Sequence, residues 1–123
     1  MSSNYRAIES VVRSLGLFGV SISTQQLICA VELAHQDPEL LLYVTKGLYP
    51  AVAKRFEFTN GSAVERNLRT ARDLVWSRGD TARLNDMAGY ELKRRPTTGE
   101  FVDIIRYYME TNLLFTDCEL TLR

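Results

Sequence analysis

The stretch YPAVAKRFEFTNGSAVERNLRTARDLVWSRG, residues 49–79, predicts a short helix, a tight polar turn and a longer helix. This layout is typical of a helix-turn-helix module. In such a module the first helix supports the second, and the first turns of the second helix enter the major groove of DNA. The side chains that would meet base edges there are Glu65, Arg66 and Arg69.

The longer helix has two chemically different faces. At about 100° per residue, four apolar side chains fall within one narrow stripe, which predicts the face that packs on a core. They are Val64, Leu68, Ala71 and Val75. The opposite arc carries the charged side chains Glu65, Arg66, Arg69 and Asp73. Because Arg66 and Arg69 are spaced i, i+3, both can point at one surface.

The shorter helix and the turn carry matching local signals. Four residues repeat at helical spacing in residues 49–56, namely Tyr49, Val52, Ala53 and Phe56. Pro50 falls in the first turn, where a missing N–H does no harm. Residues 59–62, Thr-Asn-Gly-Ser, are expected to supply the turn and the helix cap.

The same residues also fit a purely structural interpretation. Many amphipathic helices with charged outer faces are simply solvated. Ser62 and Glu65 match the S-x-x-E capping box, in which the glutamate returns to the helix start. Arg72 and Asp73 lie mid-helix and are expected to pair with neighbours, so neither is assigned to base reading.

The rest of the chain predicts helices with short connections, hence an all-α domain with a helix-turn-helix at about 49–78. The expected helices are 5–15, 24–35, 38–46, 49–56, 62–78, 81–87 and 98–114. Gly16 and Gly19 are expected to end the first helix, and Asp37 and Pro38 to begin the third. Thr97 and Glu100 form a second predicted capping box.

Charge is balanced overall but unevenly placed. The chain has 15 Lys plus Arg and 15 Asp plus Glu. Residues 54–83 contain seven basic and four acidic side chains, a net charge of +3, which leaves −3 for the remainder. Such polarity lets one basic face meet phosphates. Residues 93–95, Lys-Arg-Arg, form a second basic cluster that fits either a solvated loop or a phosphate contact.

Several longer strings resemble one family, the C-terminal effector domain of the stage-zero sporulation master regulator. They are YRAIE at 5–9, ELLLYVTKGLYPAVAKRF at 39–56, VERNLRTARDLVWSRG at 64–79, GY at 89–90 and PTTGEF at 96–101. The resemblance implies that Ser62, Glu65, Arg66 and Arg69 contact a duplex box with a GTCG core. Ala63 and Thr70 depart from the family pattern, where an arginine and a histidine are usual, so the preferred box can differ.

The resemblance also implies partners and further contacts. Family members occupy paired boxes head to tail as dimers and touch the RNA polymerase sigma subunit, here through residues 77–90. We expect positioning on the DNA backbone by Ser62, Lys54, Arg55, Asn60, Lys93, Arg94 and Arg95. The family's receiver domain has no counterpart in these 123 residues, which have room for one domain, residues 1–123. The chain is then either an excised effector domain or a free-standing protein.

Other functional classes find little support. The sequence contains neither GxxxxGK[ST] nor HExxH, so we expect no enzyme and no cofactor. His35 is the only histidine, which excludes a His-based metal cluster and favours a structural role near a helix end. Cys29 is expected to be a buried small hydrophobe and Cys118 a free thiol, and Trp76 is assigned to packing.

Two further expectations concern localisation and the tail. Residues 1–4 show no secretory signal and no apolar run is long enough to cross a bilayer, so we expect a soluble cytoplasmic protein. The tail, residues 113–123, is rich in apolar side chains that need cover, by folding back or by pairing with a second copy. The alternative function is a protein-interaction module that modulates a full-length regulator without reading DNA.

Overall fold

A computed structural model describes residues 3–17 and 21–116, and every regular element in these ranges is helical. The elements are α1 (Ser3–Ser14), α2 (Ile22–Gln36), a 3-10 helix (Pro38–Leu41), a π-helix (Val44–Leu48), α3 (Tyr49–Ala53), α4 (Gly61–Arg78), α5 (Thr81–Ala88) and α6 (Thr98–Thr111). The predicted all-α fold class is therefore confirmed.

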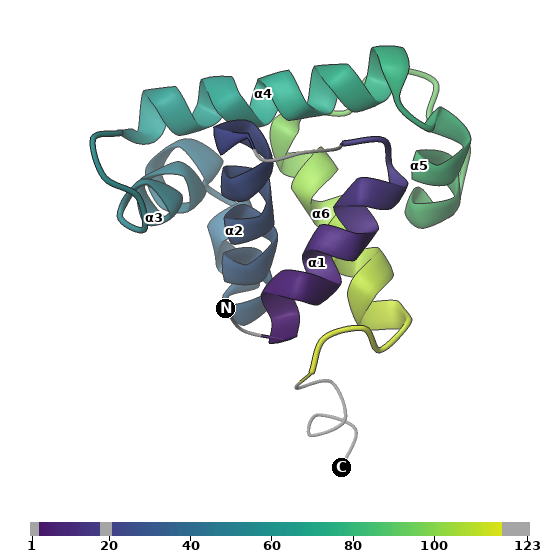
Figure 1. The fold of residues 1–123 in the computed structure, drawn as a ribbon, viewed down its shortest axis with the longest axis horizontal. Helices are drawn as coiled ribbons and strands as arrows, with labels where there is room; N and C mark the ends of the chain where they lie inside the picture. The colour runs from purple at the N-terminus through teal and green to yellow at the C-terminus, as the bar shows by residue number, and fades with distance from the viewer. Residues whose placement is uncertain (1–2, 18–20, 117–123) are drawn as a thin grey trace.

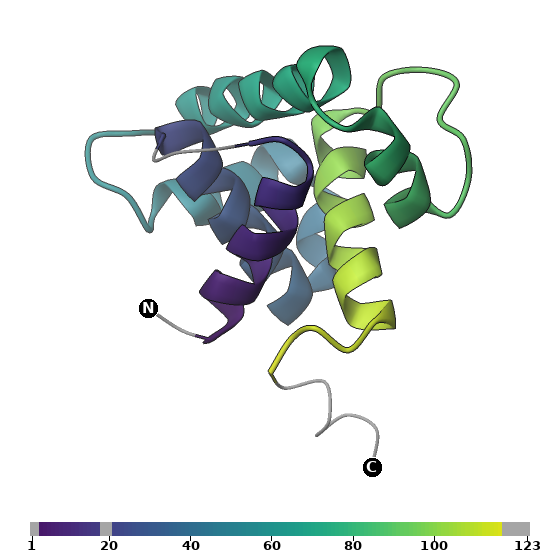
Figure 2. The same ribbon diagram turned by 45° about the vertical axis from the view of Figure 1, so that its right-hand side comes forward.

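The long helix α4 lies across one side of the molecule, above α1, α2 and α6 (Figure 1). Helix α3 lies beneath the N-terminal end of α4, and α5 lies beside its C-terminal end. The turned view in Figure 2 shows the loop between α5 and α6 projecting beyond the helices. Because α2, α3 and α6 all pack against α4 from one side, its other side is left to solvent.

The core explains why α4 is fixed in this position. All four side chains of its apolar stripe are fully buried, as the 3.6-residue period predicts: Val64, Leu68, Ala71 and Val75. They join fully buried residues from the other main helices, including Ile8, Leu27, Ile28, Phe101 and Ile105. The Tyr49 hydroxyl also forms a short hydrogen bond with the Thr98 hydroxyl, which joins the start of α3 to the start of α6.

The predicted helix at 38–46 is wrong as a single element. Asp37 does cap the segment, accepting the Glu39 N–H at 3.2 Å, but the 3-10 helix ends at Leu41. A π-helix follows, after Leu42 and Tyr43, which are 71% and 68% exposed. A continuous helix is stabilised mainly by burying an apolar face, and these two side chains find no core to pack on.

Two other helices end three residues earlier than predicted. Helix α3 stops at Ala53, and the N–H groups of residues 54–56 bond back to carbonyls three or four residues earlier, so the chain tightens into the turn. Helix α6 stops at Thr111 rather than 114, because Leu113 adopts a left-handed backbone with φ 57°. Its start is as predicted, with Thr97 and Glu100 forming a complete capping box.

The end of α1 docks on the end of α4. Gly16 ends α1 with φ 102°, as predicted, whereas Gly19 lies outside the described residues. The Asp80 N–H then donates to the Leu15 carbonyl at 3.0 Å. A side chain at Gly79 would collide with the Leu15 carbonyl oxygen, so this contact requires glycine. The contact fixes the C-terminal end of α4 against α1.

The tail folds back as far as the structure describes it. Phe115 is buried and stacks on the His35 ring, with centroids 3.7 Å apart. His35 Nδ1 also lies 2.8 Å from a carboxylate oxygen of Glu110, so the histidine has the structural role that was predicted. Leu113 and Leu114 stay partly exposed, and the predicted cover for Leu120 and Leu122 lies outside the described residues.

Candidate DNA interface

The helix-turn-helix is capped by a different residue from the one that the capping-box pattern indicates. The Asn60 side chain accepts the Ala63 N–H at 2.9 Å, and its extended backbone (φ −146°, ψ 177°) starts the helix at Gly61. A capping box between Ser62 and Glu65 is therefore wrong. Glu65 lies more than one turn into the helix, which releases its carboxylate from the helix start.

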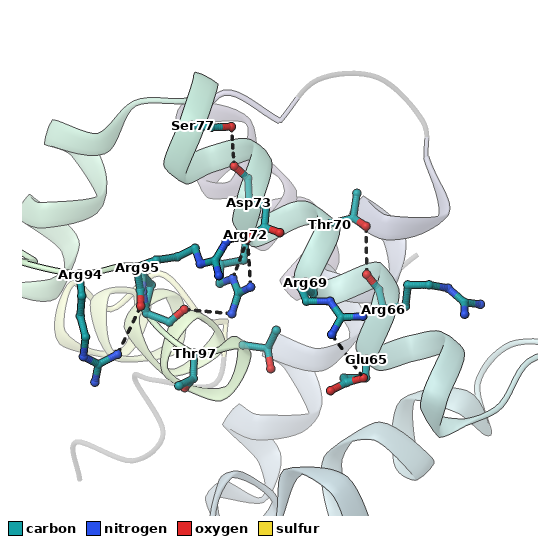
Figure 3. A network of polar contacts seen from close by, with 12 residues as sticks. Glu65, Arg66, Arg69, Thr70, Arg72, Asp73, Ser77, Arg94, Arg95 and Thr97 are labelled. Carbon is teal, nitrogen blue, oxygen red and sulfur yellow. Dashed lines mark hydrogen bonds and ion pairs between the residues drawn. The ribbon is translucent and has the colours of Figure 1, made fainter.

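The predicted base-reading side chains share the solvent side of the first turns of α4 (Figure 3). Glu65 is 46% exposed and Arg69 is 49% exposed, and their charged atoms are 4.0 Å apart. Arg66 is exposed and extends away from this pair. A loose, exposed i, i+4 ion pair contributes little to stability, so both members can exchange it for another partner at small cost.

Thr70, one of the two departures from the family pattern, is turned toward its own helix. Its hydroxyl donates to the Arg66 carbonyl at 3.0 Å (Figure 3). Such back-bonding is a common way for a threonine to satisfy its hydroxyl inside a helix. Ala63, the other departure, offers no polar group. The outward chemistry of this face therefore rests on Glu65, Arg66 and Arg69.

A partly buried polar contact that the sequence did not predict anchors the same helix. Asn67 Nδ2 donates to Gln26 Oε1 at 2.9 Å, and Gln26 is only 1% exposed. The two residues are 41 positions apart, on α4 and α2. A buried amide without a partner is costly, so this pair fixes the rotation of α4 about its axis. No periodic signal in the sequence points to it.

Arg72 and Asp73 pair with neighbours, as predicted. Arg72 is buried and donates to the Pro96 carbonyl at 3.2 Å and to Asp73 Oδ1 at 3.1 Å. Arg95 reaches the same Asp73 oxygen at 3.0 Å (Figure 3). These contacts tie the middle of α4 to the loop between α5 and α6, so Arg72 serves the fold rather than the exposed face.

The remaining basic residues divide into paired and exposed groups. Lys54 and Arg55 are exposed directly after α3, and Lys93 is exposed in the α5–α6 loop. Arg94 instead contacts Glu100, with nitrogen–oxygen distances of 3.3 and 3.4 Å. A hydrogen bond from the Thr97 backbone, assisted by Arg94, lowers the pKa of the Glu100 carboxyl. Two arginines of the 93–95 cluster are thus engaged within the domain.

The other candidate residues have structural environments. Burial raises the pKa of the Cys29 thiol to about 11, so the thiol stays protonated and packs as a small hydrophobe. Trp76 packs against the core, and Cys118 lies outside the described residues. Within residues 3–17 and 21–116, no cluster of three or more His, Cys, Asp or Glu side chains could hold a metal ion. No helix there is long and apolar enough to cross a bilayer.

A comparison with known families supports the geometric picture. The family model described as "Sporulation initiation factor Spo0A C terminal" matches residues 8–109. The match covers most of the 123-residue chain and includes the helix-turn-helix, the α5–α6 loop and nearly all of α6. The family is a DNA-binding effector domain of a transcription regulator of sporulation and is not an enzyme family.

Proposed function

Because the chain belongs to the Spo0A C-terminal family, we propose that residues 1–123 form one domain that reads double-stranded DNA in a sequence-specific way and regulates transcription. One observation carries the proposal. Glu65, Arg66 and Arg69 lie on the solvent side of the first turns of α4, while the apolar stripe behind them is fully buried. A rigidly held helix with outward-facing ionic groups is the arrangement that major-groove readers use.

The chemistry of the three side chains fits base reading. An arginine fork matches the O6 and N7 acceptors of guanine, and a carboxylate accepts from the N4 amine of cytosine. Each good pair contributes about 1–3 kcal/mol of discrimination against a wrong base. Arg66 and Arg69 would read guanines and Glu65 a cytosine, which agrees with the GTCG core that the family resemblance implies. The loose Glu65–Arg69 pair would open on binding.

Positioning on the backbone would come from the residues around this face. Ser62 has an exposed hydroxyl in the first turn of α4, and Lys54 and Arg55 are exposed in the turn before it. Asn60 would act indirectly, since its side chain already caps the helix. In the 93–95 cluster, Lys93 is exposed, whereas Arg94 and Arg95 would have to leave Glu100 and Asp73 to reach phosphates.

The same proposal includes two protein partners that the family resemblance implies, a second copy of the chain and the RNA polymerase sigma subunit. The chain would occupy paired boxes head to tail as a dimer, and a footprint of one isolated box per bound protein would contradict this. It would also contact the RNA polymerase sigma subunit through residues 77–90, which include the whole of α5. Polymerase recruitment that survives charge reversal across this segment would exclude that contact.

The test compares affinities for a duplex with a GTCG-core box and for a scrambled duplex at two salt concentrations. We expect the protein to bind the box duplex about 10³-fold more tightly than the scrambled duplex, or more. Arg66→Ala and Arg69→Ala should remove the preference, whereas Arg78→Ala, an exposed arginine in the last turn of α4, should keep it. A higher salt concentration should lower the affinity of the protein for both duplexes.

The opposite outcome would favour a different function. Equal or absent binding to the two duplexes would mean that the helix-turn-helix is retained only as a scaffold. The observation behind this second candidate is that Ala63 and Thr70 leave no outward polar group at the two departures. The chain would then be a protein-interaction module that modulates a full-length regulator, and tight pairing with such a regulator would be its signature.

A further inference from the structure

Phe58, in the turn of the helix-turn-helix, has a conformation that the fold itself does not explain. Its side chain is 102% exposed, and its backbone is in the left-handed region with φ 57°. That region is unfavourable for bulky L-residues, and a fully exposed phenyl ring gains nothing from the core. The neighbouring aromatic residue, Phe56, packs against the core instead. Backbone outliers of this kind cluster at functional sites.

Phe58 lies in the turn next to the proposed DNA-facing surface. Phe58 precedes the N-cap residue Asn60 by two positions, so their Cα atoms lie within about 7 Å of each other. The N-terminal turns of α4, which begin at Asn60, are the part of the module that would enter the major groove. Earlier in the same turn, Lys54 and Arg55 are exposed and suited to phosphates.

The surroundings of the ring favour DNA over a protein partner. The residues that flank Phe58 in the turn, Glu57 and Thr59, are charged or polar, so the ring is not part of an apolar run. A protein interface needs about 800 Å² on each partner, whereas one aromatic side chain buries about 150–250 Å². An isolated ring in a polar turn instead suits a single apolar feature of a duplex, and the thymine 5-methyl group in the major groove is such a feature.

We propose that Phe58 is a specificity-determining residue whose ring packs on a thymine methyl group at the edge of the box read by Glu65, Arg66 and Arg69. The inference rests on the proposed function and adds to it a preference for a thymine that no polar side chain would read. The left-handed backbone at Phe58 presents the ring outward, ahead of the first turn of α4.

The experiment replaces the thymines of the box duplex one at a time by deoxyuridine, which removes only the methyl group. Affinities are measured for the unaltered chain, Phe58→Ala and Tyr107→Ala, a matched exposed aromatic on α6. One deoxyuridine should weaken the unaltered chain about tenfold, within the range of a base contact. Phe58→Ala should weaken binding to the normal box by a similar factor. The affinity of this variant should not change further when that thymine is replaced by deoxyuridine. Tyr107→Ala should behave like the unaltered chain.

The possible outcomes distinguish failure of the Phe58 contact from failure of the proposed DNA-reading function. If Phe58→Ala binds the normal box as well as the unaltered chain does, while Arg66→Ala loses the box, the inference is overturned and the DNA-reading function stands. If Phe58→Ala weakens binding but no deoxyuridine substitution lowers the affinity of the unaltered chain, the proposed methyl contact is likewise wrong. If the unaltered chain does not prefer the box over a scrambled duplex, both fail. Equal thermal midpoints for the three proteins would show that folding does not cause the differences.

Discussion

Asn67 of α4 donates from Nδ2 to Oε1 of the buried Gln26 on α2, at 2.9 Å. Helix α4 packs on the core through an apolar stripe, and such a stripe alone allows small rotations of the helix about its own axis. The directional hydrogen bond restricts them. The bond therefore couples the interior to the exposed face, because rotation of α4 would move Glu65, Arg66 and Arg69 together.

Asn67→Ala should lower both stability and box preference. The substitution leaves the Gln26 amide buried without this partner, which costs about 1–3 kcal/mol. Urea unfolding would measure that loss. The double variant Gln26→Leu with Asn67→Leu should recover much of the stability, since both polar groups are removed together. A destabilisation below about 0.5 kcal/mol for Asn67→Ala would contradict this account.

Arg72→Met should distinguish a structural arginine from the arginines that we propose to read bases. Arg72 is buried and reaches the Pro96 carbonyl and Asp73. Its loss leaves the buried Pro96 carbonyl without this donor, while Asp73 keeps Arg95, and should destabilise the domain by about 1–3 kcal/mol. Arg69→Ala, at an exposed position, should change stability by less than about 0.5 kcal/mol but remove base discrimination. Urea unfolding and duplex affinity, measured on both variants, should give opposite rankings.

The outward position of the three proposed base-reading side chains could be predicted because it follows from periodicity. Once Val64 and Leu68 are buried, a helix of 3.6 residues per turn must direct Glu65, Arg66 and Arg69 away from the core. The capping residue could not be predicted in the same way. Asn60 and Ser62 are both good caps, and the choice depends on the extended backbone at Asn60.

Tertiary context decided the features that the sequence left open. Residues 37–48 begin with a valid helix start at Asp37 and Pro38. The helix nevertheless breaks where Leu42 and Tyr43 find nothing to pack on. The contact between Gln26 and Asn67 joins positions that are distant in the chain, and neither residue has a local pattern that marks it. Periodicity describes one element at a time, so contacts of this kind lie beyond it.

Gly79→Ala should destabilise the junction between α1 and α4. A Cβ at this position would lie 2.8 Å from the Val75 Cα and would collide with the Leu15 carbonyl oxygen, and backbone atoms cannot move aside cheaply. We expect a loss of about 1–3 kcal/mol, typical of overpacking, measured by urea unfolding. Gly61→Ala is the matched control, because its nearest atom would be at an ordinary 3.6 Å. Similar stabilities for the two variants would argue against close packing at Gly79.

Glu100 should give the domain part of its acid sensitivity. The Thr97 backbone N–H, and then Arg94, hold the pKa of this carboxyl below its ordinary value. A carboxyl with a lowered folded-state pKa contributes stability above its unfolded-state pKa, about 4.3, and this contribution is lost as the pH falls through the folded-state value. Because half of the Glu100 side chain is exposed, solvent screens the effect and the contribution should be small.

Glu100→Gln should therefore lower stability slightly at neutral pH and flatten its dependence on pH below about 4.3. Urea unfolding at a series of pH values between neutral and strongly acidic would show this as a shallower slope for the variant. Glu91→Gln changes an exposed carboxylate that caps no helix and should keep the slope of the unaltered chain. If both variants gave the same slope as the unaltered chain, the capping box at the start of α6 would not contribute to acid sensitivity. The alternative source would then be the cluster of Asp103, Arg106 and Glu110 farther along the same helix.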